Sequence, residues 1–187
     1  MGRPSISEQR RIEIGRALQT CMIRNGSYES TSVKDIAQQA GIATGLVHHY
    51  FTSKDEILLL MADNALLDVS NVLEDILHTR QGAARREKLH ELLADNSQSR
   101  FILMLYTLSL SMPEIKERIL ARHKELEEAL AARLRRSRTF AGDPEETAYE
   151  LMFLLESAVI QSAVAQTPSM EGLLARVLQS AFPAAEE

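Results

Sequence analysis

Two adjacent histidines and a tyrosine occur in the short segment AGIATGLVHHYFTSK, residues 40–54. Imidazole and phenol groups can bind a metal, transfer a proton or donate hydrogen bonds to a polyanion. Zinc on a single helix needs histidines three or four positions apart, on one face. His48 and His49 are neighbours, about 100° apart around a helix, and no cysteine or acid lies at the required spacing. The sequence therefore predicts no metal site and favours a surface that touches another molecule.

Other catalytic chemistry has little support in the sequence. The single cysteine, Cys21, recurs in phase with apolar residues of a predicted helix over residues 8–24, which favours a core position over a nucleophile. The chain has no glycine-rich phosphate loop and no recognisable nucleophile motif. We therefore predict that the protein is not an enzyme and needs no cofactor.

Residues 33–52 have the pattern of a helix-turn-helix unit, in which two short helices share a small core. Ser32 and Asp35 have the spacing of a capping box, which predicts a helix start, and Gly41 suits a left-handed turn. A second helix is expected over residues 44–51. The positions predicted to face inward are Ile36, Ala37, Ala40, Ile42, Val47, Tyr50 and Phe51.

The opposite side of the second helix is predicted to be small, polar and exposed. Gly45 and His49 point directly away from the core, Leu46 and His48 flank them, and Thr44 lies at the N-terminal end. Such an edge suits the major groove of DNA, where hydroxyl, imidazole and methyl groups contact base edges and phosphates. Gly45 disfavours a helix by about 1 kcal/mol relative to alanine, and a close approach to DNA is one reason to keep it.

Charge is distributed unevenly along the chain. The net charge is −5, yet residues 1–54 hold seven Lys/Arg against four Asp/Glu, which indicates that only this part meets a polyanion. Apolar runs are too short to span a bilayer and the first residues lack the apolar segment of a signal peptide, so a cytoplasmic protein is expected.

Helical periodicity extends over most of the sequence, and strand-like alternation is almost absent. We predict an all-α fold of about nine helices, with a helix-turn-helix domain at residues 1–53 and a helical bundle at residues 54–187. Ser53 and Glu56 indicate a capping box at the start of the long helix 54–77. Further helices are expected over residues 84–95, 98–111, 113–138, 143–165 and 169–181. The charge-rich helix 113–138 is predicted to present a solvated face.

The stretch TSVKDIAQQAGIATGLVHHYFTSKDEIL resembles the DNA-binding domain of the TetR family of transcriptional regulators. TGLVHHYF followed by Lys54 is most similar to the BetI branch, which responds to choline. The resemblance implies contacts with double-stranded DNA at Lys34, Thr44, Gly45, Leu46, His48, Tyr50 and Lys54, to which the outward position adds His49. Ala43 stands where the family often has serine, so the helix cap is expected to pass to Thr44. Arg3 either enters a minor groove or belongs to a disordered tail.

The second half of the chain is expected to supply a dimer interface and an effector cavity. Helices at about 145–165 and 169–181 are apolar on more than one side, which favours a symmetric homodimer that reads a palindromic operator. By resemblance to the family, a small-molecule effector would enter the bundle beside residues 100–110. Its expected contacts are Met104, Tyr106, Phe153 and Glu156, for which a core or interface role is the alternative.

Two other functions fit the same residues. The chain could be a helical protein-interaction module whose basic N-terminal part never meets DNA. It could also be a small helical metalloenzyme that uses His48 and His49. The resemblance and the predicted outward edge favour a ligand-responsive transcriptional repressor over both.

Overall fold

The computed structural model describes residues 5–78, 82–94, 96–137, 140–165, 172 and 175–178. Every element delimited in these ranges is a helix, which confirms the predicted all-α fold. Residues 172 and 175–178 are helical, and the rest of the predicted helix 169–181 lies outside the described residues. The eight delimited helices are α1 (Ile6–Asn25), α2 (Val33–Gln39), α3 (Thr44–Tyr50), α4 (Lys54–His78), α5 (Gly82–Ala94), α6 (Asn96–Leu108), α7 (Pro113–Arg136) and α8 (Pro144–Ala165).

The chain divides into two compact units, Met1–Ala65 and Leu66–Glu187. The sequence-based division falls earlier, after residue 53, because it follows the helix-turn-helix pattern and not the packing. The first turns of α4 belong with α1: a Cβ added to Gly15 would lie 2.3 Å from Sδ of Met61. With residues 55–65 included, the first unit holds seven Lys/Arg and seven Asp/Glu. The net charge of this unit is therefore zero and does not by itself favour DNA binding. The positions of individual cations matter instead.

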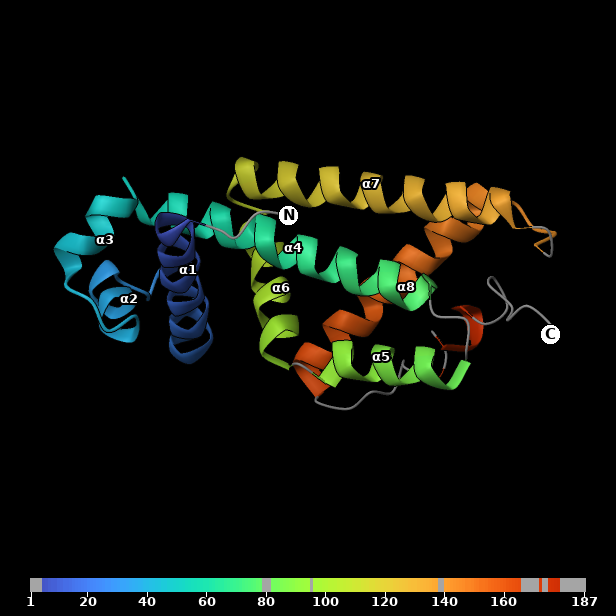
Figure 1. Cartoon of the computed structure of the whole chain (residues 1–187), viewed down its shortest axis with the longest axis horizontal. Coiled ribbons are helices and arrows are strands. Elements are labelled where there is room, and N and C mark those ends of the chain that lie inside the picture. Colours follow the sequence, from blue (N-terminus) through green and yellow to red (C-terminus); the bar gives the residue numbers. More distant parts are fainter. Residues whose placement is uncertain are drawn as a thin grey trace. The chain divides into compact units, whose positions relative to one another are not determined.

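In the first unit, α1, α2 and α3 pack around a small apolar core (Figure 1). The stripe predicted on α1 is buried as expected, and Cys21 lies within it with no exposed surface. Burial is the main cause that raises the pKa of the Cys21 thiol, so the neutral form is favoured. From the helix-turn-helix, Ile36, Ala37, Val47 and Phe51 are buried, whereas Ala40, Ile42 and Tyr50 are only half-buried.

Helix starts in the first unit are fixed by side-chain caps. The predicted box at Ser32 is confirmed: Ser32 Oγ accepts from the Asp35 amide at 3.1 Å, and Asp35 accepts from the Ser32 amide at 2.9 Å. The box predicted at Ser53 is only half formed. Ser53 Oγ accepts from the Glu56 amide, but the Glu56 carboxylate accepts from the amide of Thr52, one residue earlier. Ser5 caps α1 with a complete box that the sequence reading did not identify.

In the second unit, α6 contacts both α7 and α8, and α5 contacts α8 (Figure 1). Phe101 and Leu105 of α6 are fully buried, as an all-round apolar helix at the centre of a bundle requires. Helix α8 has a different environment on its two sides. Leu151 and Leu155 are buried, whereas four large apolar side chains are exposed: Tyr149, Phe153, Ile160 and Val164. Within the described residues, α8 is the one helix long and apolar enough to cross a membrane.

Candidate nucleic-acid interface and C-terminal cavities

The turn between α2 and α3 has the geometry that its glycine predicts. Gly41 adopts φ 67°, the left-handed region that a Cβ disfavours. The amide of Gly41 donates to the Gln38 carbonyl at 3.2 Å, and that of Ile42 donates to the Ala37 carbonyl at 3.0 Å. These two bonds form a Schellman motif, which ends α2 and directs the chain into α3. Nothing lies within 4 Å of a Cβ built on Gly41, so its backbone conformation alone favours glycine.

Helix α3 is held by one face and leaves the other in solvent. Val47 is 1 % exposed and Phe51, which follows the helix, is 2 % exposed. The side chains predicted to face outward are all exposed: Thr44, Leu46, His48 and His49, together with the backbone at Gly45. Ala43 is the N-cap residue and makes no side-chain cap, so the expected transfer of the cap to Thr44 is wrong. The predicted exposed edge is therefore present.

The two histidines do not form part of a metal cluster in the described residues, where no group of three metal-binding side chains occurs. The ring of His49 packs edge-on against the ring of Tyr50, with centroids 5.1 Å apart. This contact restricts the orientation of the His49 ring.

The lysines predicted to contact DNA lie in different environments. Lys34 is exposed on the first turn of α2. Lys54 is turned inward: its Nζ donates to the carbonyls of Tyr28 and Thr31, each at 2.8 Å, and lies 3.8 Å from the centre of the Tyr28 ring. Burial lowers the pKa of the Lys54 ammonium. The ammonium of Lys54 therefore ties the segment before α2 to the start of α4.

Tyr28 completes this junction from the other side. Its hydroxyl donates to the carboxylate of Asp55, and its side chain is buried. Burial first, and the bond to Asp55 second, raise the pKa of the Tyr28 phenol. The phenol therefore stays protonated and can keep donating to Asp55 at all physiological pH values.

Arg11 is the residue of this unit that the sequence reading missed, because it counted there only as a positive charge. Its guanidinium donates to the Tyr50 carbonyl at the end of α3 and to Glu56 at 2.8 Å, and it lies 4.1 Å from the centre of the Phe51 ring. One planar group thus joins α1, the end of α3 and the first turn of α4. Arg11 first, and the Thr52 amide second, lower the pKa of Glu56 to about 2.

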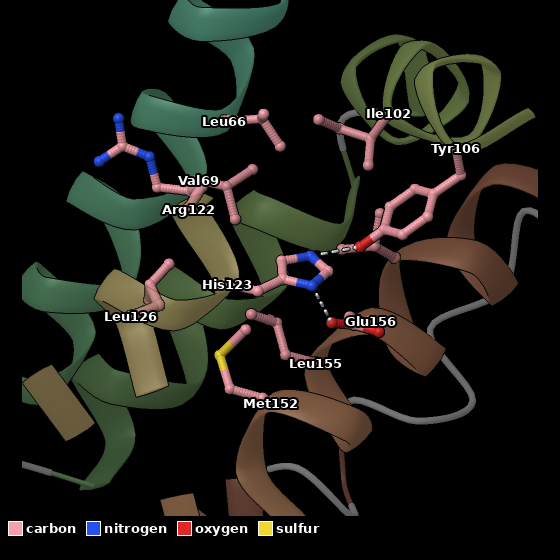
Figure 2. A pocket seen from close by; sticks show the side chains of 11 residues that line it. Leu66, Val69, Ile102, Tyr106, Arg122, His123, Leu126, Met152, Leu155 and Glu156 are labelled. Carbon is pink, nitrogen blue, oxygen red and sulfur yellow. Dashed lines mark hydrogen bonds and ion pairs between the residues drawn. The ribbon is translucent and has the colours of Figure 1, made fainter. Parts of the chain in front are cut away.

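The second unit contains a narrow apolar cavity of about 40 Å³ between α4, α6, α7 and α8. Figure 2 shows the side chains that line it: Leu66, Val69, Ile102, Tyr106, Arg122, His123, Leu126, Met152, Leu155, Glu156 and Val159. Of the four residues predicted to contact an effector, Tyr106 and Glu156 line the cavity. Met104 and Phe153 do not, and Phe153 is 63 % exposed on α8.

His123 links the two polar residues of this cavity and was not predicted to belong to it. Its Nε2 lies 2.8 Å from the Tyr106 hydroxyl, and its Nδ1 lies 3.3 Å from a carboxylate oxygen of Glu156 (Figure 2). Burial, followed by the charge of Glu156, raises the pKa of Tyr106, so its hydroxyl remains protonated. In the sequence, His123 lies within a charge-rich helix, and only the fold shows which of its faces is covered.

A second, wider cavity of about 380 Å³ shares Val69 with the narrow one. Three carboxylates and one lysine line it, from Asp68, Asp75, Glu91 and Lys88, together with Leu92 and Gln98. Lys88 pairs with Asp75. The lining of this cavity therefore carries more negative than positive charge.

Residues 22–61 match the family model described as bacterial regulatory proteins, tetR family. The chain is 38% identical over 63 residues to the HTH-type transcriptional regulator HbdR of Aromatoleum sp. (strain CIB), which is 34% of this chain and 27% of that protein. It is 32% identical over 69 residues to the regulator PksA of Bacillus subtilis (strain 168), which is 37% of this chain and 33% of that protein. The chain thus matches about a third or less of the length of these relatives.

Most of the chain shares its fold with solved structures. A TetR transcription regulator from Haloarcula marismortui ATCC 43049 has a TM-score of 0.74, with 19% identity, and the match covers 95% of this chain and 98% of that one. The sequence match lies in the segment that contains the turn at Gly41 and helix α3. The family match is therefore limited to a segment of the first unit, and the structural match shows a shared fold that includes the second.

Proposed function

We propose that this protein is a ligand-responsive transcriptional repressor that binds a palindromic operator as a homodimer, because residues 22–61 match the model of the TetR regulators. The observation that carries the proposal is the exposed edge of α3, where Thr44 to His49 leave only Val47 buried. That edge presents a hydroxyl, a glycine backbone, one methyl-rich side chain and two imidazoles. These groups can contact phosphates and base edges in a major groove.

Within this edge the residues have separate roles. Thr44, Leu46 and His48 are proposed to reach base edges or phosphates, and Gly45 lets the helix backbone approach the duplex. Lys34 is proposed to contact phosphate from the first turn of α2. His49 and Tyr50 act as a pair, because their rings are in contact. The resemblance of TGLVHHYF with Lys54 to the BetI branch stays a prediction.

Lys54 and Arg11 support this surface from behind. The Lys54 ammonium is satisfied by two carbonyls and a ring face, so contact with DNA would require it to exchange partners. We therefore place Lys54 as a positioning residue, with phosphate contact as its predicted second role. Arg11 fixes the end of α3 against the start of α4.

Dimerisation is proposed through α8 and the predicted helix 169–181. The exposed apolar residues of α8 are Tyr149, Phe153, Ile160 and Val164. Their spacings of four, seven and four residues are each close to a whole number of helical turns, so they form a single stripe along α8. Two copies related by a two-fold axis would bury both stripes, and would present two recognition helices about 34–36 Å apart for a palindrome. Burial of the stripe in this dimer is also the reason to place the protein in the cytoplasm and not in a membrane.

Effector response is proposed to act through the narrow cavity. Its volume of about 40 Å³ holds about three water molecules, so an effector of more than a few atoms must separate the helices that line it. The effector therefore binds better to the widened state, which is the requirement for shifting an equilibrium. Helix α4 begins in the DNA-binding unit at Lys54 and supplies Leu66 and Val69 to the cavity.

Binding to DNA is tested by a gel shift with the region upstream of the gene and a scrambled fragment of equal length, at several salt concentrations. A DNA-binding regulator prefers the upstream fragment and loses affinity steeply as salt rises. A protein-interaction module would bind neither fragment. Stoichiometric zinc or iron in the purified protein would instead favour the metalloenzyme that uses His48 and His49.

Gly45→Ala tests the role of the α3 edge within that assay. A Cβ on Gly45 meets nothing within 4 Å, and alanine is the better helix former, so the free energy of unfolding should rise by up to about 1 kcal/mol. If the backbone approaches the duplex here, operator affinity should fall while stability rises. An unchanged affinity would remove Gly45 from the interface.

A further inference from the structure

We propose that the effector of the narrow cavity is a small protonated amine, with N–H donors on a short apolar body. This inference rests on the proposed function for its regulatory meaning, but binding itself can be measured without DNA. It concerns the chemistry of the cavity lining, where one carboxylate lies in apolar surroundings and the guanidinium nearby is already paired.

Glu156 is the acceptor that this amine would bind. It is the only carboxylate among the eleven residues that line the cavity, and its side chain is 30% exposed. Its contact with His123 is 3.3 Å, longer than the 2.8 Å between His123 and Tyr106. An ammonium that donates to Glu156 can form a shorter, charge-assisted bond while His123 keeps its bond to Tyr106.

The only arginine of the lining does not offset this carboxylate. Arg122 NH1 lies 2.8 Å from Glu125, which is not part of the cavity lining. Glu156 is therefore the acidic group of the lining that this arginine leaves unpaired, with His123 as its neighbour. An anionic effector would meet this like charge at close range, which disfavours carboxylates and phosphates.

The wider cavity next to it gives independent support for a cation. Asp68, Asp75 and Glu91 line it against the single Lys88, and Lys88 already pairs with Asp75. Because Val69 borders both cavities, a ligand that reaches the narrow one from this side passes an acidic region first. Such a region raises the local concentration of cations and lowers that of anions.

The polar groups of the cavity also select an amine with N–H bonds over a quaternary ammonium. Glu156 and the Tyr106 hydroxyl are hydrogen-bond acceptors, which a quaternary nitrogen cannot use. Quaternary groups are usually bound by several aromatic faces, and Tyr106 is the one tyrosine, phenylalanine or tryptophan in the lining. The apolar part of the amine would contact Leu66, Ile102 and Leu155.

The test uses four ligands with one branched body and different head groups: isopentylamine, isopentanol, isovalerate and isopentyl-trimethylammonium. Binding to the full-length protein is measured by titration calorimetry and by the shift in thermal melting temperature. We expect the primary amine to bind at least about tenfold more tightly than the alcohol, since a charge-assisted bond replaces a neutral one. The carboxylate and the quaternary ammonium should bind more weakly than the alcohol or not at all.

Glu156→Gln should reduce the advantage of the amine over the alcohol to about twofold or less, because the charge is removed and the shape is kept. Glu150→Gln is the matched control, since Glu150 is an exposed acid on the same helix. The amine should keep its full advantage in this control. Preserved alcohol binding in both variants would show that the cavity is still folded.

The proposal is overturned if isovalerate binds as well as the amine, if the amine keeps its advantage in Glu156→Gln, or if none of the four ligands binds. A protein that binds the amine but no DNA would retain this inference and lose the proposed function. A protein that binds its operator but none of these ligands would retain the DNA-binding part of the proposed function and lose this inference.

Discussion

The two units of this protein hold their polar groups in opposite ways. In the first unit, the cations of Arg11 and Lys54 are turned inward onto backbone carbonyls, and the exposed edge of α3 from Thr44 to His49 carries no lysine or arginine. In the second unit, Tyr106, His123 and Glu156 meet at the wall of an apolar cavity. The surface proposed for DNA thus has its backbone held from behind by cations. The site proposed for an effector has its polar side chains in contact with one another.

Arg11→Met gives the largest expected effect and tests whether the first unit depends on its inward cations. The change removes the guanidinium that donates to the Tyr50 carbonyl and to Glu56, and it leaves Glu56 only its bonds from Thr52. Hydrogen bonds to charged groups are worth about 1.5–3 kcal/mol, so denaturant unfolding should show a loss of about 2 kcal/mol. Operator affinity should fall further, since the end of α3 is no longer fixed.

Arg16→Met is the control for this change, because Arg16 lies exposed on the same helix. Arg11→Lys should recover only part of the loss, since one ammonium cannot reach both acceptors in the plane of a guanidinium. Equal stability of Arg11→Met and Arg16→Met would show that the contacts of Arg11 are incidental.

Gly41→Ala has the next largest expected effect. It should lower the free energy of unfolding by about 1–2 kcal/mol, because alanine is disfavoured in the left-handed conformation at φ 67°. The space around Gly41 is open, so no clash contributes. Gly41→Asn should recover much of the stability, since asparagine tolerates this conformation. Gly26→Ala is the control: Gly26 has φ 83° at the end of α1 and should lose similar stability. Operator affinity should fall more for Gly41→Ala, because its turn sets the direction of α3.

In the first unit, contacts between residues close in the sequence could be predicted, and contacts between distant residues could not. Ser32, Asp35, Gly41 and Val47 act through contacts within a few positions of one another, so their spacing predicted the turn and the exposed edge. Arg11 acts on residues about forty positions away, and its role depends on a side-chain contact that no local pattern encodes.

The same reason explains the cavity in the second unit. His123 meets Glu156 only because α7 packs against α8, and the charges around His123 in the sequence predict a solvated face. Tyr106 and Glu156 were predicted as polar groups on apolar helices, and both line the cavity. Phe153 has the same kind of local sequence but faces outward, since periodicity cannot distinguish two apolar sides of α8.

Tyr106→Phe has a smaller expected effect and tests the second unit. It removes the hydroxyl that lies 2.8 Å from His123 Nε2 and changes little else. The free energy of unfolding should fall by about 1 kcal/mol, the usual net value of a partly buried hydrogen bond. Glu150→Gln, which changes an exposed polar group on α8 outside the proposed dimer stripe, should leave unfolding unchanged. If both variants unfold alike, His123 and Tyr106 do not form a stabilising pair.

The smallest effect concerns the acid side of the stability profile in the first unit. The pKa of Glu56 is lowered from 4.5 to about 2 by Arg11 and the Thr52 amide. A carboxylate with a depressed folded-state pKa stabilises the protein fully above its unfolded pKa, and this contribution is lost as pH falls from about 4.5 through about 2. The pair is partly exposed, so screening limits the effect to about 1 kcal/mol or less.

Glu56→Gln should therefore lower stability at neutral pH and flatten its decline between pH 5 and pH 2 (about the span of the two pKa values). Glu29→Gln removes the same charge from an exposed position of the same unit and serves as the control. The measurement is urea unfolding at several pH values. In Arg11→Met the further change Glu56→Gln should have almost no effect on the slope, because the main cause of the lowered pKa is already absent. If Glu56→Gln still flattened the decline of stability in the Arg11→Met background, the lowered pKa of Glu56 would be assigned to the Thr52 amide, and Arg11 would then hold α3 only through the Tyr50 carbonyl.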